Sequence, residues 1–321
     1  MIRNTLSPFP ESSQPMSIDA YRKQVSLLMR ILPIVAQEQC FALKGGTAIN
    51  LFVRDMPRLS VDIDLAYLPI LDREESLGEI DASLKRIASE LGQRISGSRV
   101  QASVLPGTGS VVKLVVNTVD AQVKIEVTPV LRGTVYSCQT LATTDKVQEE
   151  FGFAKVNVVS FADLYGGKLV AALDRQHPRD LFDVRLLLAA EGISRELFEA
   201  FLVYLISHNR PMSEIISPKF KDIRREFERG FTGMTTEAVS LADLEETREQ
   251  LVIAIRSSFL DSDRRFLLSM KNGNPDWSLL AVEDVEQLPA VRWKLRNLEN
   301  MDKDKRAALY KQLEIVLAMK N

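Results

Sequence analysis

Two glycines between a buried strand and a short helix constrain this sequence more than any other feature. The apolar run 40–43 predicts a strand, and it leads into Gly45, Gly46 and Thr47 at the start of a short helix. Glycine has no Cβ, so its backbone can approach a phosphate closely, and a helix N-terminus offers free N–H groups and a positive dipole end. The segment therefore predicts a cradle for nucleotide phosphates.

A second strand is predicted to follow, and it carries two carboxylates. Asp62 and Asp64 alternate with Ile63 and Leu65, so the carboxylates share one face of the strand and the apolar side chains share the other. Oxygen ligands at this spacing suit a hard divalent cation such as Mg²⁺. An acidic pair on an edge strand, or a pair of turn caps, has the same spacing, so the motif alone leaves these interpretations open.

Glu126 is the third candidate metal ligand. It lies on the polar face of the alternating segment 122–130. If that strand neighbours the strand of Asp62 and Asp64, three carboxylates would meet, and such a cluster can hold one or two Mg²⁺ ions for in-line phosphoryl transfer. A strand with one solvent-facing side shows the same alternation.

Composition limits the class of protein. With 321 residues and 45% apolar residues, the chain can build a large core and two domains. Its net charge of −2 argues neither for nor against nucleic acid as a partner. Cys40 and Cys138 form no metal or disulfide pattern. No signal peptide and no run of ~18 apolar residues is present, so we expect a cytoplasmic protein without a membrane partner.

The change of periodicity along the chain predicts an α+β fold. Residues 1–17 are expected to form a flexible arm, residues 18–158 a mixed sheet flanked by helices, and residues 159–321 a helical domain. Residues 131–158 match neither period. Helices are predicted at 18–38, 73–95, 164–176, 179–192, 194–208, 213–230, 239–258, 261–272, 283–298 and 303–320, and strands at 40–43, 60–65, 100–105, 110–117 and 122–130.

Lys168 follows two glycines inside a predicted helix. Each glycine costs about 1 kcal/mol relative to alanine in a helix, so Gly166 and Gly167 indicate that something approaches this backbone closely. The positive charge of Lys168 would suit a phosphate group.

Asp180 and Asp183 lie three residues apart on the next predicted helix and therefore share a face. A role in the site is favoured, more for Asp180 than for Asp183. An aspartate near a helix start is also ordinary dipole stabilisation, and Asp183 could pair with Arg179 or Arg185. His177 and His208 form no catalytic arrangement that the sequence supports.

Basic and aromatic residues alternate near the C-terminus. One interpretation is a helix with Trp293 in the core and a solvated basic face; the other is a surface that contacts RNA phosphates. The candidate RNA contacts are Arg264, Arg265, Arg292, Lys294 and Arg296.

Four segments together resemble the AbiEii toxin family, nucleotidyltransferase toxins of bacterial toxin–antitoxin and phage-defence systems. That family is related to the MenT toxins and, more distantly, to the DNA polymerase β superfamily. The resemblance extends over about residues 40–300. It is carried by residues 43–51, by residues 58–65, by Lys168 with 175–183, and by 289–297.

The resemblance implies a nucleotidyltransferase-like sheet domain and a helical domain that completes the active site and binds the acceptor. It assigns Gly45, Gly46 and Thr47 to phosphate binding. It assigns the remaining site residues as follows: Asp62 and Asp64 to metal binding, Glu126 to the third carboxylate of the superfamily, Lys168 to the essential lysine, and Arg179, Asp180 and Asp183 to the family's R-D-x-x-D block.

The implied reaction is Mg²⁺-dependent transfer of a nucleoside monophosphate from an NTP to RNA, at the 3′ end of tRNA, which stops translation. The implied partner is a winged-helix antitoxin, which often neutralises without a stable complex. A small-molecule, aminoglycoside-type nucleotidyltransferase would need an acidic acceptor cleft, which the basic clusters disfavour. A catalytically silent fold is disfavoured by the intact glycine and aspartate motifs.

Ser60 lies two residues before Asp62 and, by alternation, on its face. We expect a phosphate on Ser60 to repel an incoming triphosphate and to compete for Mg²⁺.

Overall fold

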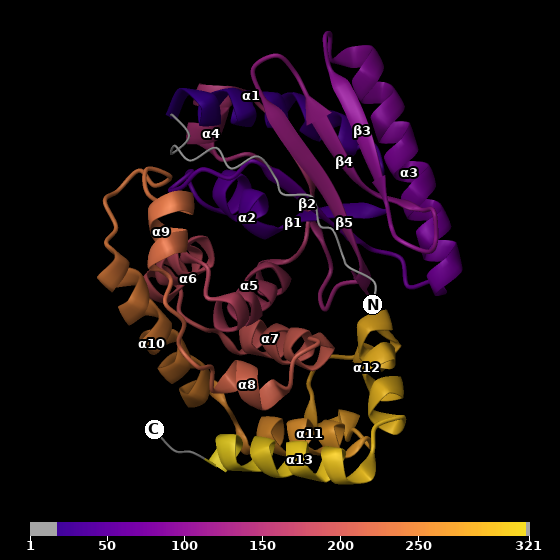
Figure 1. Ribbon diagram of the computed structural model, residues 1–321, viewed down its shortest axis with the longest axis vertical. Coiled ribbons are helices and arrows are strands. Elements are labelled where there is room, and N and C mark those ends of the chain that lie inside the picture. Colours follow the sequence, from indigo (N-terminus) through magenta and orange to yellow (C-terminus); the bar gives the residue numbers. More distant parts are fainter. Residues whose placement is uncertain (1–17, 319–321) are drawn as a thin grey trace, which may run out of the picture.

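A mixed seven-stranded sheet forms one half of the molecule in the computed structural model, which describes residues 18–318 (Figure 1). The strand order is β3-β4-β5-β2-β1-β7-β6. The centre of this sheet pairs β2 with β1 in antiparallel and with β5 in parallel orientation. The strands are β1 (Phe41–Lys44), β2 (Asp62–Tyr67), β3 (Arg99–Val104), β4 (Val111–Asn117), β5 (Gln122–Arg132), β6 (Gln139–Ala142) and β7 (Lys155–Val158).

The two faces of the sheet differ as the alternation on β5 predicts. Val123, Ile125 and Val127 are buried, on the face that packs against α1 (Ile18–Val35) and α3 (Arg73–Arg94). The opposite face carries polar residues, including Glu126. The helical half lies beyond this face in Figure 1, so the polar face of the sheet looks toward those helices.

Residues 131–158, which match no period, complete the sheet. They form the end of β5, then β6, helix α4 (Asp145–Phe151) and β7. Strands of four residues are too short to show a period, which is why β6 and β7 escape prediction. Between β1 and β2, residues Gly45–Ala48 form the single turn α2, which continues as a π-helical turn over Ile49–Val53.

Helices alone follow Val158 within the described residues, as expected. The predicted helix 213–230 is wrong, because Pro218 interrupts it and residues 218–223 are not helical. The helices are α5 (Phe161–Arg175), α6 (Pro178–Ala190), α7 (Arg195–Ser207), α8 (Met212–Ile216), α9 (Arg224–Gly230), α10 (Leu241–Ser258), α11 (Asp261–Asn272), α12 (Pro289–Glu299) and α13 (Lys303–Ala318).

Helix α5 is the centre of the helical half. Ser160 caps it by accepting a hydrogen bond from the Asp163 backbone N–H. A Cβ atom at Gly166 would lie 2.9 Å from Ala200 Cβ and 2.9 Å from the Phe201 nitrogen. The close approach predicted at the two glycines is therefore that of α7, and it is packing between helices.

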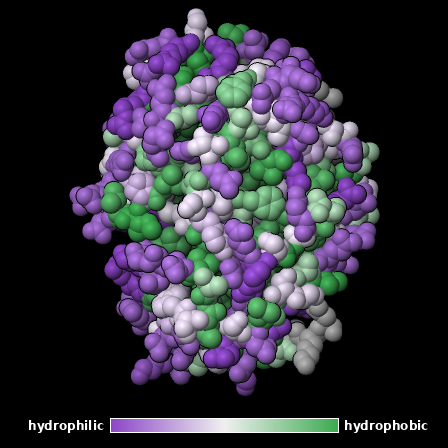
Figure 2. All heavy atoms as spheres, turned by 180° about the vertical axis from the view of Figure 1, so that it is seen from behind, coloured by the Kyte–Doolittle hydropathy of each residue, from purple (hydrophilic) through white to green (hydrophobic). Residues whose placement is uncertain are grey.

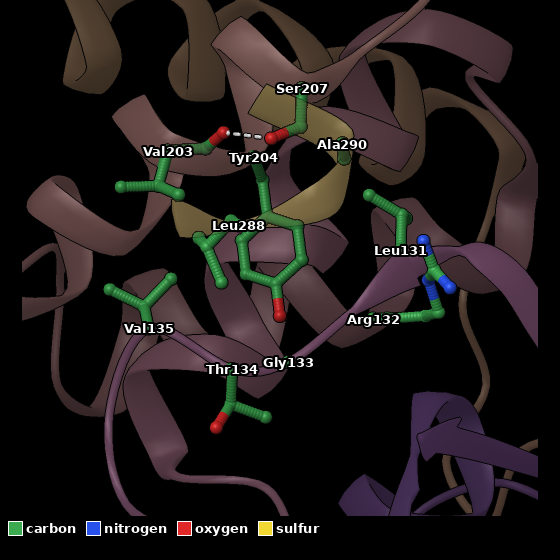
Figure 3. Close-up of a pocket in the computed structure, with 10 residues that line it drawn as sticks. All are labelled: Leu131, Arg132, Gly133, Thr134, Val135, Val203, Tyr204, Ser207, Leu288 and Ala290. Carbon is green, nitrogen blue, oxygen red and sulfur yellow. Dashed lines mark hydrogen bonds between the residues drawn. The ribbon is translucent and has the colours of Figure 1, made fainter. Parts of the chain in front are cut away.

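The seam between β5, α7 and α12 contains a cavity of about 20 Å³ (Figure 3). The ring of Tyr204 and the side chain of Leu288 point into it, and Arg132 lies at its edge. The volume has room for about one water molecule. Arg132 Nε is buried and has no hydrogen-bond partner among residues 18–318, so a water is the group that this cavity suits.

Figure 2 shows the molecule from behind. In this view the rim is mostly hydrophilic, and the apolar residues near the centre are interrupted by polar ones. Within residues 18–318, no helix combines the length and apolarity needed to cross a membrane.

Opposite effects on stability are predicted for alanine at the two neighbouring glycines of α5. Gly166→Ala should lower the free energy of unfolding by ~1–3 kcal/mol, because its methyl group collides with α7. Gly167→Ala should raise it by ~0.5–1 kcal/mol, because a Cβ there meets Tyr204 no closer than 3.6 Å and the helix loses a glycine. Urea denaturation of both variants measures the difference, and equal effects would contradict this account of the packing.

Candidate active site

Four charged residues lie in register across the polar face of the sheet, two carboxylates between two lysines. Lys44 on β1 pairs in register with Asp64 on β2, which pairs with Glu126 on β5, which in turn pairs with Lys113 on β4. Asp64 therefore has a lysine on one side and a carboxylate on the other. The predicted adjacency of the strands of Asp64 and Glu126 is confirmed.

The two glycines after β1 allow the loop to lie against charged side chains. Gly45 has a φ of +75°, which favours glycine, and a Cβ there would lie 2.5 Å from Asp64 Oδ2. A Cβ at Gly46 would lie 2.7 Å from Arg58 Nη2. The missing side chains at Gly45 and Gly46 therefore leave space for the Asp64 carboxylate and the Arg58 guanidinium.

Thr47 connects the start of α2 to the strand that carries the aspartates. Its side chain is buried, and its hydroxyl donates to the carbonyl oxygen of Asp62 and lies 3.1 Å from Ser60 Oγ. The hydroxyl of Thr47 is therefore engaged within the fold, and its role is to hold α2 against β2.

The Asp64 carboxylate is buried among other charged groups. Burial raises its pKa, as do the charges of Asp62 and Glu126, whereas Lys44 and Lys168 lower it. The Lys44 ammonium crosses the face of β2 to donate to Thr128 Oγ1 on β5 at 3.2 Å. Burial lowers the pKa of Lys44 and the charge of Asp64 opposes that shift, so the two groups support each other's ionised form.

Glu126 neighbours the aspartates in register but its side chain turns away from them. Its carboxylate lies 3.1 Å from Lys113 Nζ and is 48% exposed. Within residues 18–318, no three acidic, histidine or cysteine side chains come close enough together to hold a metal ion. The expected three-carboxylate cluster is therefore not assembled, and Asp62 and Asp64 are the two carboxylates available on one face.

A buried ionic network lies beside the aspartate pair. Arg58 donates to both oxygens of Asp183, at 2.7 Å from Nε and 2.6 Å from Nη2. Lys168 Nζ lies 2.8 Å from Asp180 and 3.0 Å from Asp183. Arg175 donates to Asp180 from the solvent side. We call these five residues the α5–α6 network.

The network has three cations and two carboxylates, so it keeps one positive charge in excess. Burial raises the pKa values of Asp180 and Asp183, but the adjacent cations outweigh it and hold both well below their usual range.

The expectation that Asp183 could pair with Arg179 or Arg185 is wrong, since Arg58 is its partner. Lys168 is likewise not a free point charge, because both carboxylates already bind it.

Ser60 precedes β2 and lies beside the glycine loop, since a Cβ at Gly46 would lie 2.9 Å from Ser60 Oγ. Its side chain is buried against Thr47. Because a kinase cannot reach a buried hydroxyl, the structure disfavours the phosphate expected on Ser60.

The start of α6 brings further groups to the network. His177 caps this helix, its Nδ1 accepting from the Arg179 N–H at 3.1 Å. Arg179 forms no ion pair with any residue from 18 to 318, and its charge lowers the pKa of Tyr21, which burial raises. Arg179 is therefore a cation that remains available beside the site, as the family motif implies.

The predicted RNA contacts differ in their exposure and in their partners. Arg264 donates to the Leu317 carbonyl and lies over the ring of Phe259, so it helps to join α11 and α13. Trp293 is 53% exposed, so the interpretation that puts it in the core is wrong. Lys294 donates to the His208 carbonyl, whereas the side chains of Arg265, Arg292 and Arg296 are exposed.

Sequence patterns miss three residues that the structure brings to the site. Lys44 directly precedes the two glycines. A lysine at the end of a strand and next to a phosphate motif is a sequence signal that could have identified it as a site residue. Arg58 and Arg175 are single arginines without a local pattern. Their partners lie on another element, and nothing in the sequence marks the pairing.

An acid-dependent loss of stability is predicted at His177. Burial and neighbouring cations lower its pKa to about 4. As the pH falls below the ordinary value near 6.5, the unfolded chain gains a proton that the folded one does not. Stability therefore declines from about pH 6.5 to about pH 4. His177→Asn keeps a helix cap without a titrating group, so its stability should vary less over that range. Urea denaturation at several pH values measures this, and identical pH profiles would refute it.

Comparison with known proteins identifies the family and the fold. The model of the nucleotidyl transferase AbiEii toxin family, of type IV toxin–antitoxin systems, matches residues 26–297. No curated protein matches the chain. The nucleotidyltransferase toxin MenT4 of Mycobacterium tuberculosis H37Rv has a similar structure, with a TM-score of 0.59 and 17% sequence identity over 88% of this chain and 95% of that one. The matched segment includes both the aspartate pair and the α5–α6 network, and the chain belongs to the AbiEii family of nucleotidyltransferase toxins.

Proposed function

We propose that this nucleotidyltransferase transfers a nucleoside monophosphate from an NTP to the 3′ end of tRNA in a Mg²⁺-dependent reaction. The observation that carries the proposal is the position of Asp62 and Asp64. They share one face of β2, between the glycine loop and a network with excess positive charge. This location suits a triphosphate with a bound metal ion. The two carboxylates would bind the metal, and the cations of the network would attract the phosphate oxygens.

The donor set at the aspartate pair fits a hard cation. The carboxylates repel each other, as the effect of Asp62 on the pKa of Asp64 indicates, and a divalent cation relieves that repulsion. Asp62 and Asp64 would be its protein ligands, with Glu126 close enough in register to join by a change of rotamer. When bound, one or two Mg²⁺ ions would neutralise phosphate charge and polarise the transferred phosphoryl group.

The residues of the chain have separate roles in this proposal. The Gly45 and Gly46 backbone and Arg179 would hold the phosphates. Asp180 and Asp183 would position Lys168, whose charge stabilises the negative charge that develops as the acceptor oxygen bonds to the α-phosphorus and pyrophosphate leaves. The acceptor proton would pass to a carboxylate of the polar face, for which Glu126 is the exposed candidate.

The partners follow from the family. A type IV toxin has a cognate antitoxin, here proposed to be a winged-helix protein that neutralises without needing a stable complex. The alternatives are an aminoglycoside-type small molecule as acceptor and a catalytically silent protein. Free Arg179 and the exposed arginines of α12 favour an RNA acceptor over a cationic small molecule.

Loss of one carboxylate should abolish transfer without unfolding the protein. Asp64→Asn should lower transfer of labelled NMP to total tRNA by at least ~100-fold, since the Asp64 carboxylate is a proposed metal ligand. Asp55→Asn is the matched control, because Asp55 is an exposed aspartate before the same strand, and its rate should stay within about twofold. Incubation with each labelled NTP, with and without EDTA, measures the rates.

The same assay separates the alternatives. Label on an aminoglycoside instead of tRNA would establish the small-molecule acceptor. Transfer to tRNA that Asp64→Asn leaves unchanged would contradict the proposed site. Absence of label on any acceptor, together with unimpaired NTP binding, would indicate the silent protein.

A further inference from the structure

A basic pocket lies at the far end of the helical half, away from the aspartate pair. It opens between the loop after α7, the end of α11, the length of α12 and the start of α13, which form the lower part of Figure 1. Its volume is about 280 Å³, close to the lower end of the ~300–1,000 Å³ range of ligand sites. Lys271, Lys294, Lys305 and Trp293 line it, and no carboxylate does.

Lys271 has no partner at this pocket. The residue is only 5% exposed, and no hydrogen bond or ion pair joins it to another residue from 18 to 318. Its ammonium keeps access to the pocket, since it does not belong to the fully buried side-chain atoms without a partner. Burial and the charge of Lys305 lower its pKa. A largely desolvated ammonium favours an anionic ligand, and no carboxylate lines this pocket to serve as one.

The other lining residues narrow the chemistry of that ligand. Lys294 donates to the His208 carbonyl, and burial together with the charge of Lys271 lowers its pKa to about 8. Trp293 lies one residue away in the sequence; it lines the pocket and is 53% exposed. Lysines bind a phosphate and an exposed indole can stack on a base, so the two features match a nucleotide unit of single-stranded nucleic acid.

We propose that this pocket binds one nucleotide of a single-stranded RNA segment, with its phosphate at Lys271 and Lys305 and its base on Trp293. The choice of RNA rests on the proposed function, because an RNA acceptor must be held by the helical half while its end reaches the aspartates. Helix α12 packs on β5, the strand of Glu126, and on α7, so it joins the pocket to the sheet. Arg292 and Arg296 are exposed on the same helix, and they extend the basic surface along the proposed path of the RNA.

Trp293 can report on the pocket directly. The chain has two tryptophans, so Trp277→Phe leaves Trp293 as the sole emitter in the full-length protein. A mixed-sequence single-stranded 12-mer RNA should quench this fluorescence, and a base-paired RNA of the same length should quench it less. Inorganic phosphate and poly-L-glutamate serve as the other anionic probes.

Lysine variants in that background test the phosphate contact. Lys271→Met removes the buried charge with little change of shape, and it should weaken RNA binding by at least fivefold while circular dichroism stays unchanged. Lys303→Met is the matched control on α13, because Lys303 is exposed and does not line the pocket. Its affinity should stay within twofold of the parent.

Three results would overturn the proposal. The first is an unchanged RNA affinity for Lys271→Met. The second is quenching by poly-L-glutamate as strong as that by RNA, which would make the pocket a site for an acidic protein segment. The third is that inorganic phosphate quenches the fluorescence whereas RNA neither quenches it nor displaces the phosphate. RNA quenching in a protein with the intact aspartate pair that transfers no label to any acceptor would leave the pocket standing and refute only the proposed reaction.

Discussion

The buried pair between Arg58 and Asp183 is the interaction on which the rest of the site depends. The arginine belongs to the segment before β2 and the aspartate to α6, so the pair joins the sheet half to the helical half. Both side chains are almost inaccessible, at 3% and 0% exposure, and two hydrogen bonds connect them. Removing one partner would leave a charge buried without compensation. The pair therefore fixes how the segment before β2 and helix α6 lie against each other.

That pair also explains how the phosphate side of the site acquires its charge. Asp183 holds Arg58 and Lys168 at once, and Asp180 holds Lys168 and Arg175. The cations are thus gathered beside Asp64 although like charges repel, because the carboxylates of α6 lie between them. One excess positive charge then remains next to the carboxylates of β2. In the proposed reaction a metal-bound triphosphate would complement both, in keeping with the nucleotidyltransferase family to which the chain belongs.

The parts of this site that the sequence predicts are those set by local pattern. The alternation of Asp62 and Asp64 with apolar residues and most of the long helices and strands follow from neighbours along the chain. Helix α4, although seven residues long, lies in the segment that matches no period and escapes prediction. Arg58 and Asp183 are 125 residues apart, and no periodicity links them. Residue type alone could not show that Lys168 would be enclosed by two carboxylates.

Other differences have the same origin. Ser60 is buried against Thr47 of another element, and Pro218 ends a helix whose apolar spacing continues past it. The exposed side of Trp293 depends on how α12 packs against its neighbours. The assignment of catalytic roles to Asp62, Asp64 and Lys168 stays a prediction that rests on the family motifs and on their shared location.

A double-mutant cycle on Arg58→Gln and Asp183→Asn tests the central pair most directly. The free energy of unfolding in urea would be measured for the parent, both single variants and the double variant. The account predicts that each single variant loses ~3–5 kcal/mol and that the two losses overlap, with a coupling of at least ~2 kcal/mol. Losses that add within ~0.5 kcal/mol would contradict it, because the two halves would then be held together by other contacts.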